Sequence, residues 1–110
     1  MRNIDSLKNK DFSKVYNLGK SFANKYLIMY VLKEDIPGIR LGISVSKKVG
    51  NSIIRHRVTR LVRESYRLNE EKLCTGISII VIGRPTARDK GYREIECAFM
   101  HLAKLHKIIA

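Results

Sequence analysis

Acidic side chains are scarce in this chain. Ten Asp and Glu residues stand against 22 Lys and Arg residues among 110 positions, which gives a formal net charge of +12 at pH 7. A field of this sign attracts phosphate-rich partners and raises the rate at which they are encountered. The imbalance therefore favours nucleic acid as the partner, with an anionic membrane surface as the second candidate.

Long apolar runs are also absent. The longest run, Tyr26 to Leu32, is far shorter than the roughly 20 residues that a helical membrane span requires, and its composition is typical of a strand. The segment MRNIDSLKNK carries charges where a secretory signal has its apolar region. We therefore expect no membrane association and a cytoplasmic location.

Cysteine occurs only at Cys74 and Cys97, and neither belongs to a closely spaced pair or a Cys/His ligand cluster. We expect both to be reduced thiols. The histidines His56, His101 and His106 have no evident nucleophile or carboxylate partner in their sequence context. The glutamates are not spaced to form a two-metal carboxylate site. We therefore predict no catalytic residue and no metal site in the protein itself.

The length and the 45% hydrophobic content suit a single domain spanning residues 1–110. We expect, in chain order, a helix from Asn9 or Asp11 to near Gly19, strands at 24–32 and 40–46, a helix at 52–69, a strand at 77–82 and a helix at about 89–108. This α-β-β-α-β-α order predicts an α+β fold, with a small mixed sheet and helices concentrated on one side.

The pairing of the expected strands follows from their spacing and composition. Strands 24–32 and 40–46 lie at hairpin spacing, and the first is apolar on both faces, so the N-terminal helix is expected to cover its second face. Strand 77–82 has the composition of a central strand. The helix between strands 40–46 and 77–82 predicts a parallel βαβ crossover, which is right-handed by default.

Helix 52–69 is the most informative element. Its apolar stripe is expected to be buried and comprises Ile54, Val58, Leu61, Val62 and Leu68. A second set of side chains forms the basic ridge, which consists of His56, Arg60, Arg63 and Arg67, with Arg55 and Arg57 at its boundary. Lys47 and Lys48 precede the helix, and the segment 42–64 contains only one acid, Glu64.

A solvated helix face normally alternates charges, whereas the basic ridge places like charges three and four residues apart, at about 0.3 kcal/mol of repulsion per pair. The guanidinium fork of arginine grips phosphate with two parallel hydrogen bonds. The helix N-terminus adds free amides beside Lys47 and Lys48, where Asn51 could cap the helix or contact RNA. The pattern predicts binding to a polyanion, with folded RNA the best match.

Three aromatic residues, Phe12, Tyr16 and Tyr30, form a second group of candidates. They could simply fill the core. The strand at 40–46 alternates, however, and turns Arg40, Gly42, Ser44 and Ser46 away from the core. Aromatic rings beside such a shallow polar floor can stack unpaired bases, at about 1–3 kcal/mol per base. We therefore expect a cleft for an extended single strand, lined by these aromatic residues and Ser44.

These residues resemble a known family. The protein subunit of bacterial ribonuclease P, which removes the 5′ leader from precursor tRNA, has a motif similar to SVSKKVGNSIIRHRVTRLVRE. Its N-terminal pattern is similar to KNKDFSKVYNLGKSFANKYLIMYVL, and the match spans nearly the whole chain. The resemblance implies that catalysis belongs to a partner RNA, which also binds most of the Mg²⁺. It further implies a monomeric protein within the ribonucleoprotein and a left-handed crossover.

The resemblance also implies roles for individual residues. Lys48, Arg55, Arg57, Arg60 and Arg63 would face the catalytic RNA, and the aromatic residues would line a cleft for the leader. The residues that we expect to bind RNA are Lys47, Lys48, Asn51, Arg55, His56, Arg57, Arg60, Arg63 and Arg67. The residues expected to bind the leader are Phe12, Tyr16, Tyr30 and Ser44.

Two positions depart from the family pattern, which usually has asparagine at the place of His56 and lysine at the place of Thr59. His56 can still donate a hydrogen bond, whereas Thr59 removes a charge.

Two other classes of function remain open. A structural RNA binder, such as a ribosomal protein or RNA chaperone, would share the ridge but lack the cleft. A self-sufficient protein nuclease would cleave without RNA.

Overall fold

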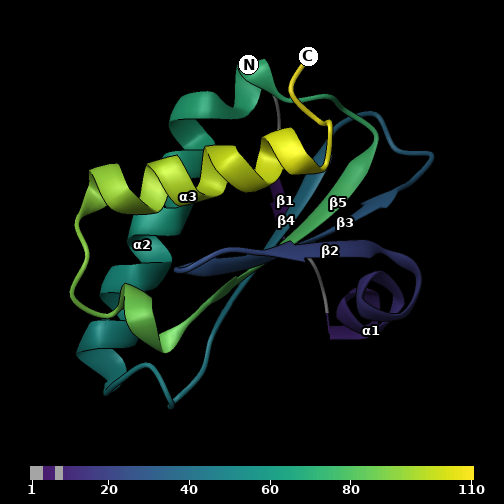
Figure 1. Cartoon of the computed structure of the whole chain (residues 1–110). Coiled ribbons are helices and arrows are strands. Elements are labelled where there is room, and N and C mark those ends of the chain that lie inside the picture. Colours follow the sequence, from purple (N-terminus) through teal and green to yellow (C-terminus); the bar gives the residue numbers. More distant parts are fainter. Residues whose placement is uncertain (1–3, 7–8) are drawn as a thin grey trace.

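Five strands form one mixed sheet in this computed structural model, which describes residues 4–6 and 9–110 (Figure 1). The elements are β1 (Ile4–Ser6), α1 (Asn9–Leu18), β2 (Lys20–Ala23), β3 (Leu27–Lys33), β4 (Ile39–Val45), α2 (Ser52–Asn69), β5 (Ile77–Gly83) and α3 (Tyr92–Leu105), with short 3₁₀ turns at Glu70–Lys72 and Pro85–Ala87. The strand order across the sheet is β1-β4-β5-β3-β2. The predicted α+β class and mixed sheet are confirmed.

Strand β5 lies at the centre of the sheet, as its composition predicts. It pairs in parallel with β4 and antiparallel with β3, so that Ile80 stands opposite both Gly42 and Tyr30. Its side chains from Ile77 to Val81 are all buried. A strand that is apolar on both faces is stable only where helices cover both faces of the sheet, and this sheet provides that cover.

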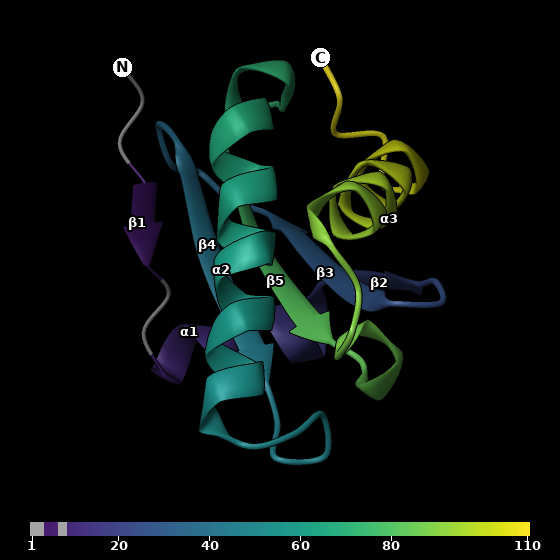
Figure 2. The same ribbon diagram turned by 90° about the vertical axis from the view of Figure 1, so that its left-hand side faces the viewer.

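The helices form two layers around the sheet. Helices α2 and α3 lie together on one face and α1 lies on the other (Figures 1 and 2). The main core fills the space beneath α2 and α3, where Val58, Val62 and Phe99 are fully buried. On the opposite face Val15 of α1 packs on Ile80, which confirms that the N-terminal helix covers the second face.

The crossover from β4 through α2 to β5 is left-handed. In Figure 2, β4 runs downward, α2 rises in front of the sheet, and β5 runs downward on the side of β4 that faces β3. The right-handed default is therefore wrong for this chain, and the hand implied by the family resemblance is confirmed. With β5 between β4 and β3, the hand is set by the face of the sheet on which α2 packs, and α2 lies on the face opposite α1 (Figures 1 and 2).

The same central position of β5 corrects two further expectations. Strands β3 and β4 form no hairpin with each other, because β5 lies between them. The antiparallel neighbour of β3 on its outer side is β2, with Phe22 opposite Met29. Neither β2 nor β1 was predicted, since β2 is short and exposed at every residue and β1 has three residues.

Leu68, which was expected in the buried stripe of α2, is exposed. The buried residues of α2 are Val58, Val62, Ser65, Tyr66 and Asn69, whereas Leu68 is 55% exposed. At about 100° per residue, Leu68 lies on the flank of that stripe and Tyr66 takes the place that was assigned to it. Leu105 at the end of α3 is 40% exposed, and α3 begins at Tyr92 rather than near residue 89.

At Gly19 the backbone passes very close to the carbonyl groups of α1 and of β3. A Cβ at this position would lie 2.6 Å from the carbonyl oxygen of Val15 and 2.9 Å from that of Val31. Only glycine allows the chain to leave α1 and enter β2 at this distance.

Among the helices of residues 4–6 and 9–110, none is long and apolar enough to cross a bilayer. Cys74 and Cys97 are free thiols, as predicted.

Candidate RNA interface

The N-terminus of α2 is built by a compact turn after β4. Val49 is fully buried and anchors the turn, and its N–H donates to the carbonyl of Ser46 at 3.1 Å. The side chain of Asn51 accepts a hydrogen bond from the N–H of Ile54 at 3.0 Å and so caps the helix. This arrangement places the exposed side chains of Lys47 and Lys48 beside the positive end of the helix dipole.

The basic ridge is on the surface, and most of its charge is not neutralised from within the chain. His56, Arg60 and Arg63 are exposed, as are Lys47 and Lys48. Among the residues that the structure describes, these five side chains form no ion pair and no hydrogen bond. The four Lys and Arg residues among them therefore present unpaired cations to solvent, which is the arrangement that a phosphate backbone would neutralise.

Two arginines of the ridge are engaged inside the protein. Arg57 donates from Nη1 to the carbonyl of Arg88 at 3.2 Å and from Nη2 to that of Lys90 at 2.5 Å. Arg67 forms two hydrogen bonds with Glu64, at 2.5 and 3.1 Å, and this contact lowers the pKa of the Glu64 carboxyl below its usual value. Arg57 thus ties the segment that precedes α3 to α2, and Arg67 is already paired.

Arg55, at the boundary of the ridge, is less exposed than the other arginines of α2. Arg55 is half-buried, and its Nε is buried without a hydrogen-bond partner among the described residues. The hydroxyl of Thr59 donates to the carbonyl of Arg55 at 2.9 Å. The threonine at this position therefore turns back onto its own helix and offers a partner neither charge nor a free hydroxyl proton.

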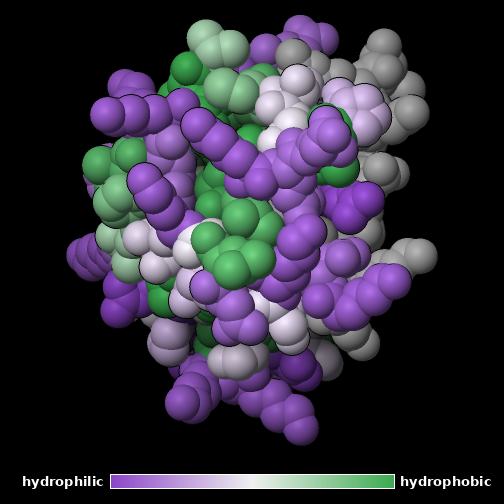
Figure 3. Space-filling view, turned by 90° about the vertical axis from the view of Figure 1, so that its right-hand side faces the viewer, coloured by the Kyte–Doolittle hydropathy of each residue, from purple (hydrophilic) through white to green (hydrophobic). Residues whose placement is uncertain are grey.

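The three aromatic residues gather on the face of the sheet that α1 covers, and we call them the aromatic cluster. The ring centroids of Phe12 and Tyr16 are 6.1 Å apart, and Tyr16 meets Tyr30 edge-on at 4.9 Å. Tyr16 is 36% exposed, and burial followed by the neighbouring Tyr30 raises the pKa of its hydroxyl. Figure 3 looks onto this side and shows apolar side chains surrounded by hydrophilic ones.

Ser44 lies on the same face but farther along the sheet. It stands opposite Ile82 in the register of β4 and β5, so β5 separates it from the strand that carries Tyr30. Ile82 packs against the Val15–Ile80 cluster. The structure therefore places Ser44 and the aromatic cluster on one surface, with apolar residues of β5 between them.

Two ion pairs hold α1 against this surface. Lys14 lies 3.1 Å from Glu34, and Asp11 lies 3.8 Å from Arg40. The Glu34 side chain is only 10% exposed and also accepts a hydrogen bond from the Ser78 hydroxyl at 2.5 Å. The Ser78 hydrogen bond is the largest cause of the lowered pKa of Glu34, with Lys14 adding to it. Sequence inspection missed this clamp because its partners lie far apart in the chain.

Comparison with known proteins agrees with this geometry. A family model described as Ribonuclease P matches residues 2–107. The chain belongs to the ribonuclease P protein family. It is similar to the ribonuclease P protein component of Lachnoclostridium phytofermentans, at 59% identity over 107 residues, covering 96% of this chain and 92% of the relative. The component from Alkaliphilus oremlandii is 52% identical over 110 residues, covering 99% and 96%.

Solved ribonuclease P proteins share the fold. One Staphylococcus aureus structure, of a mutant described as defective in mRNA degradation activity, has a TM-score of 0.88 and 35% identity, covering 94% of this chain and 89% of that one. The Thermotoga maritima protein has a TM-score of 0.84 and 28% identity, covering 92% and 96%. The resemblance stated from the sequence is therefore confirmed.

Proposed function

We propose that this chain is the protein subunit of a ribonuclease P ribonucleoprotein, which removes the 5′ leader from precursor tRNA. Membership of the family supports the role as a subunit. The partner of the basic ridge would be the catalytic RNA of the complex, and the aromatic cluster would bind the single-stranded leader of the substrate.

The observation that carries this proposal is the set of unpaired cations at and before α2. Lys47, Lys48, Arg60 and Arg63 are exposed and make no ion pair with any residue in the described part of the chain. A folded protein that keeps like charges this close gains free energy when phosphates approach and counterions are released. The ridge would supply affinity for RNA without reading its sequence.

The aromatic cluster supports the second half of the proposal. Tyr16 and Tyr30 are partly exposed, and on this side of the molecule apolar side chains are surrounded by hydrophilic ones (Figure 3). Unpaired bases would stack on the rings while the phosphates of the leader stay at the hydrophilic rim. Mature tRNA has no leader, so this surface would favour the precursor over the product.

The protein would not supply the catalytic centre. Within residues 4–6 and 9–110, no three His, Cys, Asp or Glu side chains come together in a group that could hold a metal ion. The described residues thus contain no such cluster, and we assign most of the Mg²⁺ to the RNA partner. The protein would act by raising the affinity of that RNA for its substrate.

Cleavage of precursor tRNA at low Mg²⁺ tests the proposal. A bacterial ribonuclease P RNA alone should cleave slowly under these conditions, and adding the protein should stimulate release of an intact leader. The variant Arg60→Ala/Arg63→Ala should stimulate less at equal protein concentration. No stimulation by the parent protein would favour a structural RNA binder, and cleavage by the RNA-free protein would indicate a nuclease. Either result would overturn the proposal.

A further inference from the structure

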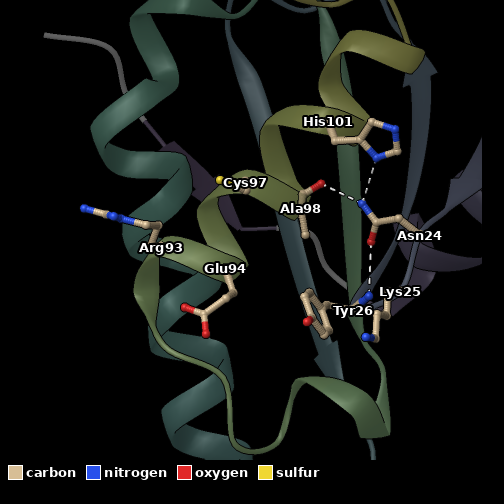
Figure 4. Close-up of a pocket in the computed structure, with 8 residues that line it drawn as sticks. All are labelled: Asn24, Lys25, Tyr26, Arg93, Glu94, Cys97, Ala98 and His101. Carbon is tan, nitrogen blue, oxygen red and sulfur yellow. Dashed lines mark hydrogen bonds between the residues drawn. The ribbon is translucent and has the colours of Figure 1, made fainter.

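A hollow between α3 and the turn that joins β2 to β3 has no role in the proposed function. It has a volume of about 460 Å³, within the roughly 300–1,000 Å³ range of small-molecule sites. One side of α3 supplies Glu94, Cys97, Ala98 and His101, and the turn between β2 and β3 supplies Asn24, Lys25 and Tyr26 (Figure 4). The helix residues recur at spacings of three and four, so one stripe of α3 forms the wall.

The side chain of Asn24 holds the two walls of this hollow together. Its Nδ2 donates to the carbonyl of Ala98 at 2.9 Å and lies 3.1 Å from Nδ1 of His101. Its Oδ1 accepts from the N–H groups of Tyr26 at 3.2 Å and Leu27 at 3.0 Å. One amide thus fixes the turn to α3 and orients the imidazole, so the hollow is preformed rather than left by loose packing.

The ring of Tyr26 is the dividing wall between two hollows. It lines the hollow against α3 and also a second one of about 280 Å³ beside the 3₁₀ turn at Pro85–Ala87. The ammonium groups of Lys25 and Lys90 lie 5.6 and 5.7 Å from its ring centroid. Both ammonium groups lie over this half-buried ring, so a planar base would contact the part of the ring that they leave open, with its phosphate near them.

The charges around the two hollows favour an anionic occupant that also carries N–H donors. The cations are Lys25, Arg88, Lys90 and Arg93, and the carboxylates are Asp89 and Glu94. Asp89 is paired with Lys90 at 3.7 Å, whereas Glu94 forms no ion pair or hydrogen bond within the described residues. A carboxylate beside an apolar wall accepts hydrogen bonds from a base, and guanine offers two adjacent N–H donors on its Watson–Crick edge.

The hollow is connected to the basic ridge. Arg57 of α2 holds the carbonyls of Arg88 and Lys90, and Arg84 donates to the carbonyl of Asn24 at 2.6 Å. The segment 84–90 therefore bridges the ridge and the turn. A strand of RNA leaving the ridge would meet the cations of this segment before it reached Tyr26.

We infer that the hollow between α3 and the β2–β3 turn binds one unpaired RNA nucleotide, with its base against Tyr26, its phosphate near Lys25 and Lys90, and a preference for guanine set by Glu94. The site goes beyond the proposed function, because neither the ridge nor the aromatic cluster includes it. Its occupant is recognised by stacking and by one carboxylate rather than by charge alone.

Nucleotide titration of the isotope-labelled full-length protein, without any RNA subunit, tests this inference by NMR. GMP should shift the amide signals of residues 24–26 and 93–101 in a saturable way at concentrations up to about 10 mM, the range of weak specific binding. Ribose 5-phosphate carries the same phosphate without a base and should not produce these shifts. Equal shifts with ribose 5-phosphate or inorganic phosphate would mean an anion site, and would overturn the inference.

Three variants sharpen the test without removing the partly buried Tyr26. Cys97 is exposed, so Cys97→Phe should fill the hollow and weaken GMP binding about tenfold or more, whereas Cys97→Ser should leave it unchanged. Glu94→Gln should weaken GMP about tenfold and leave UMP unchanged. Unchanged GMP binding by Cys97→Phe, or GMP shifts confined to other residues, would refute the site. Because no RNA subunit is present, these outcomes are independent of the proposed ribonuclease P role.

Discussion

Removing two unpaired arginines should change how RNA binding depends on salt. Arg60 and Arg63 are exposed and form no ion pair with the described residues, so Arg60→Ala/Arg63→Ala removes contacts to RNA without leaving a carboxylate unpaired. Lys47 and Lys48 are free in the same way, whereas Arg57 and Arg67 are engaged. With about 0.7 counterion released per contact, four free cations predict a log–log salt slope of about −2.8.

The double variant should then show a slope of about −1.4 and about 25-fold weaker binding at about 0.1 M salt, with the difference vanishing near about 1 M. Fluorescence anisotropy with a labelled ribonuclease P RNA, at fixed Mg²⁺ and several KCl concentrations, measures both quantities. The matched control is Lys33→Gln/Lys104→Gln, which removes the same charge from exposed positions outside α2. If parent, variant and control share one slope, the reasoning from the ridge is refuted.

Three further predictions concern the cluster, the α1 clamp and the β2–β3 turn. Phe12→Ala and Tyr30→Ala should weaken binding of precursor tRNA to the holoenzyme by about 1–3 kcal/mol per lost base contact and leave binding of mature tRNA unchanged, with Phe22→Ala as the aromatic control. Equal losses for both tRNAs would rule out a role of the aromatic cluster in binding the leader. Glu34→Gln should reduce the fall in the free energy of unfolding that occurs as the pH is lowered. The folded-state pKa of Glu34 is lowered, so its stabilisation is present above its usual pKa of 4.5 and is lost as pH falls through the folded value; parallel urea curves for both proteins below pH 4.5 would contradict this. Asn24→Ala should lower the free energy of unfolding by about 1–3 kcal/mol, because the side-chain amide of Asn24 forms hydrogen bonds both to α3 and within its own turn. The control Asn17→Ala, on the exposed face of α1, should change it by less than about 0.5 kcal/mol. Similar melting curves for the two variants would show that the turn is held by other contacts.

The sequence was sufficient for the elements with strong periodicity. Helix α2, its Asn51 cap and the central position of β5 could be predicted because each has a clear local pattern. Strand β2 could not be predicted, since four exposed residues carry no alternation and pairing with β3 defines them as a strand. The hand of the crossover depends on where β5 inserts and on which face of the sheet α2 packs, and both are tertiary properties. Only the family resemblance indicated it in advance.

In the candidate site too, helical spacing predicted which residues share a surface, but it did not predict contacts with distant parts of the chain. The pattern of the ridge placed His56, Arg60 and Arg63 on one exposed surface, because helical spacing alone determines which residues share a face. It did not distinguish them from Arg57 and Arg67. The partners of Arg57 are backbone carbonyls more than 30 residues away, and Arg67 pairs with the single acid of the helix. Hydrogen bonds to distant backbone atoms leave no mark in a sequence.

Site-directed crosslinking within the assembled complex tests the central account most directly. A photo-crosslinking amino acid in place of Ile53, which is 78% exposed on α2, removes no cation of the ridge, and a second one in place of Tyr16 reports on the aromatic cluster. The account predicts that position 53 crosslinks to the ribonuclease P RNA, and that position 16 crosslinks to the 5′ leader of precursor tRNA. Crosslinks from position 53 to the leader, or none from it to the RNA subunit, would contradict the account.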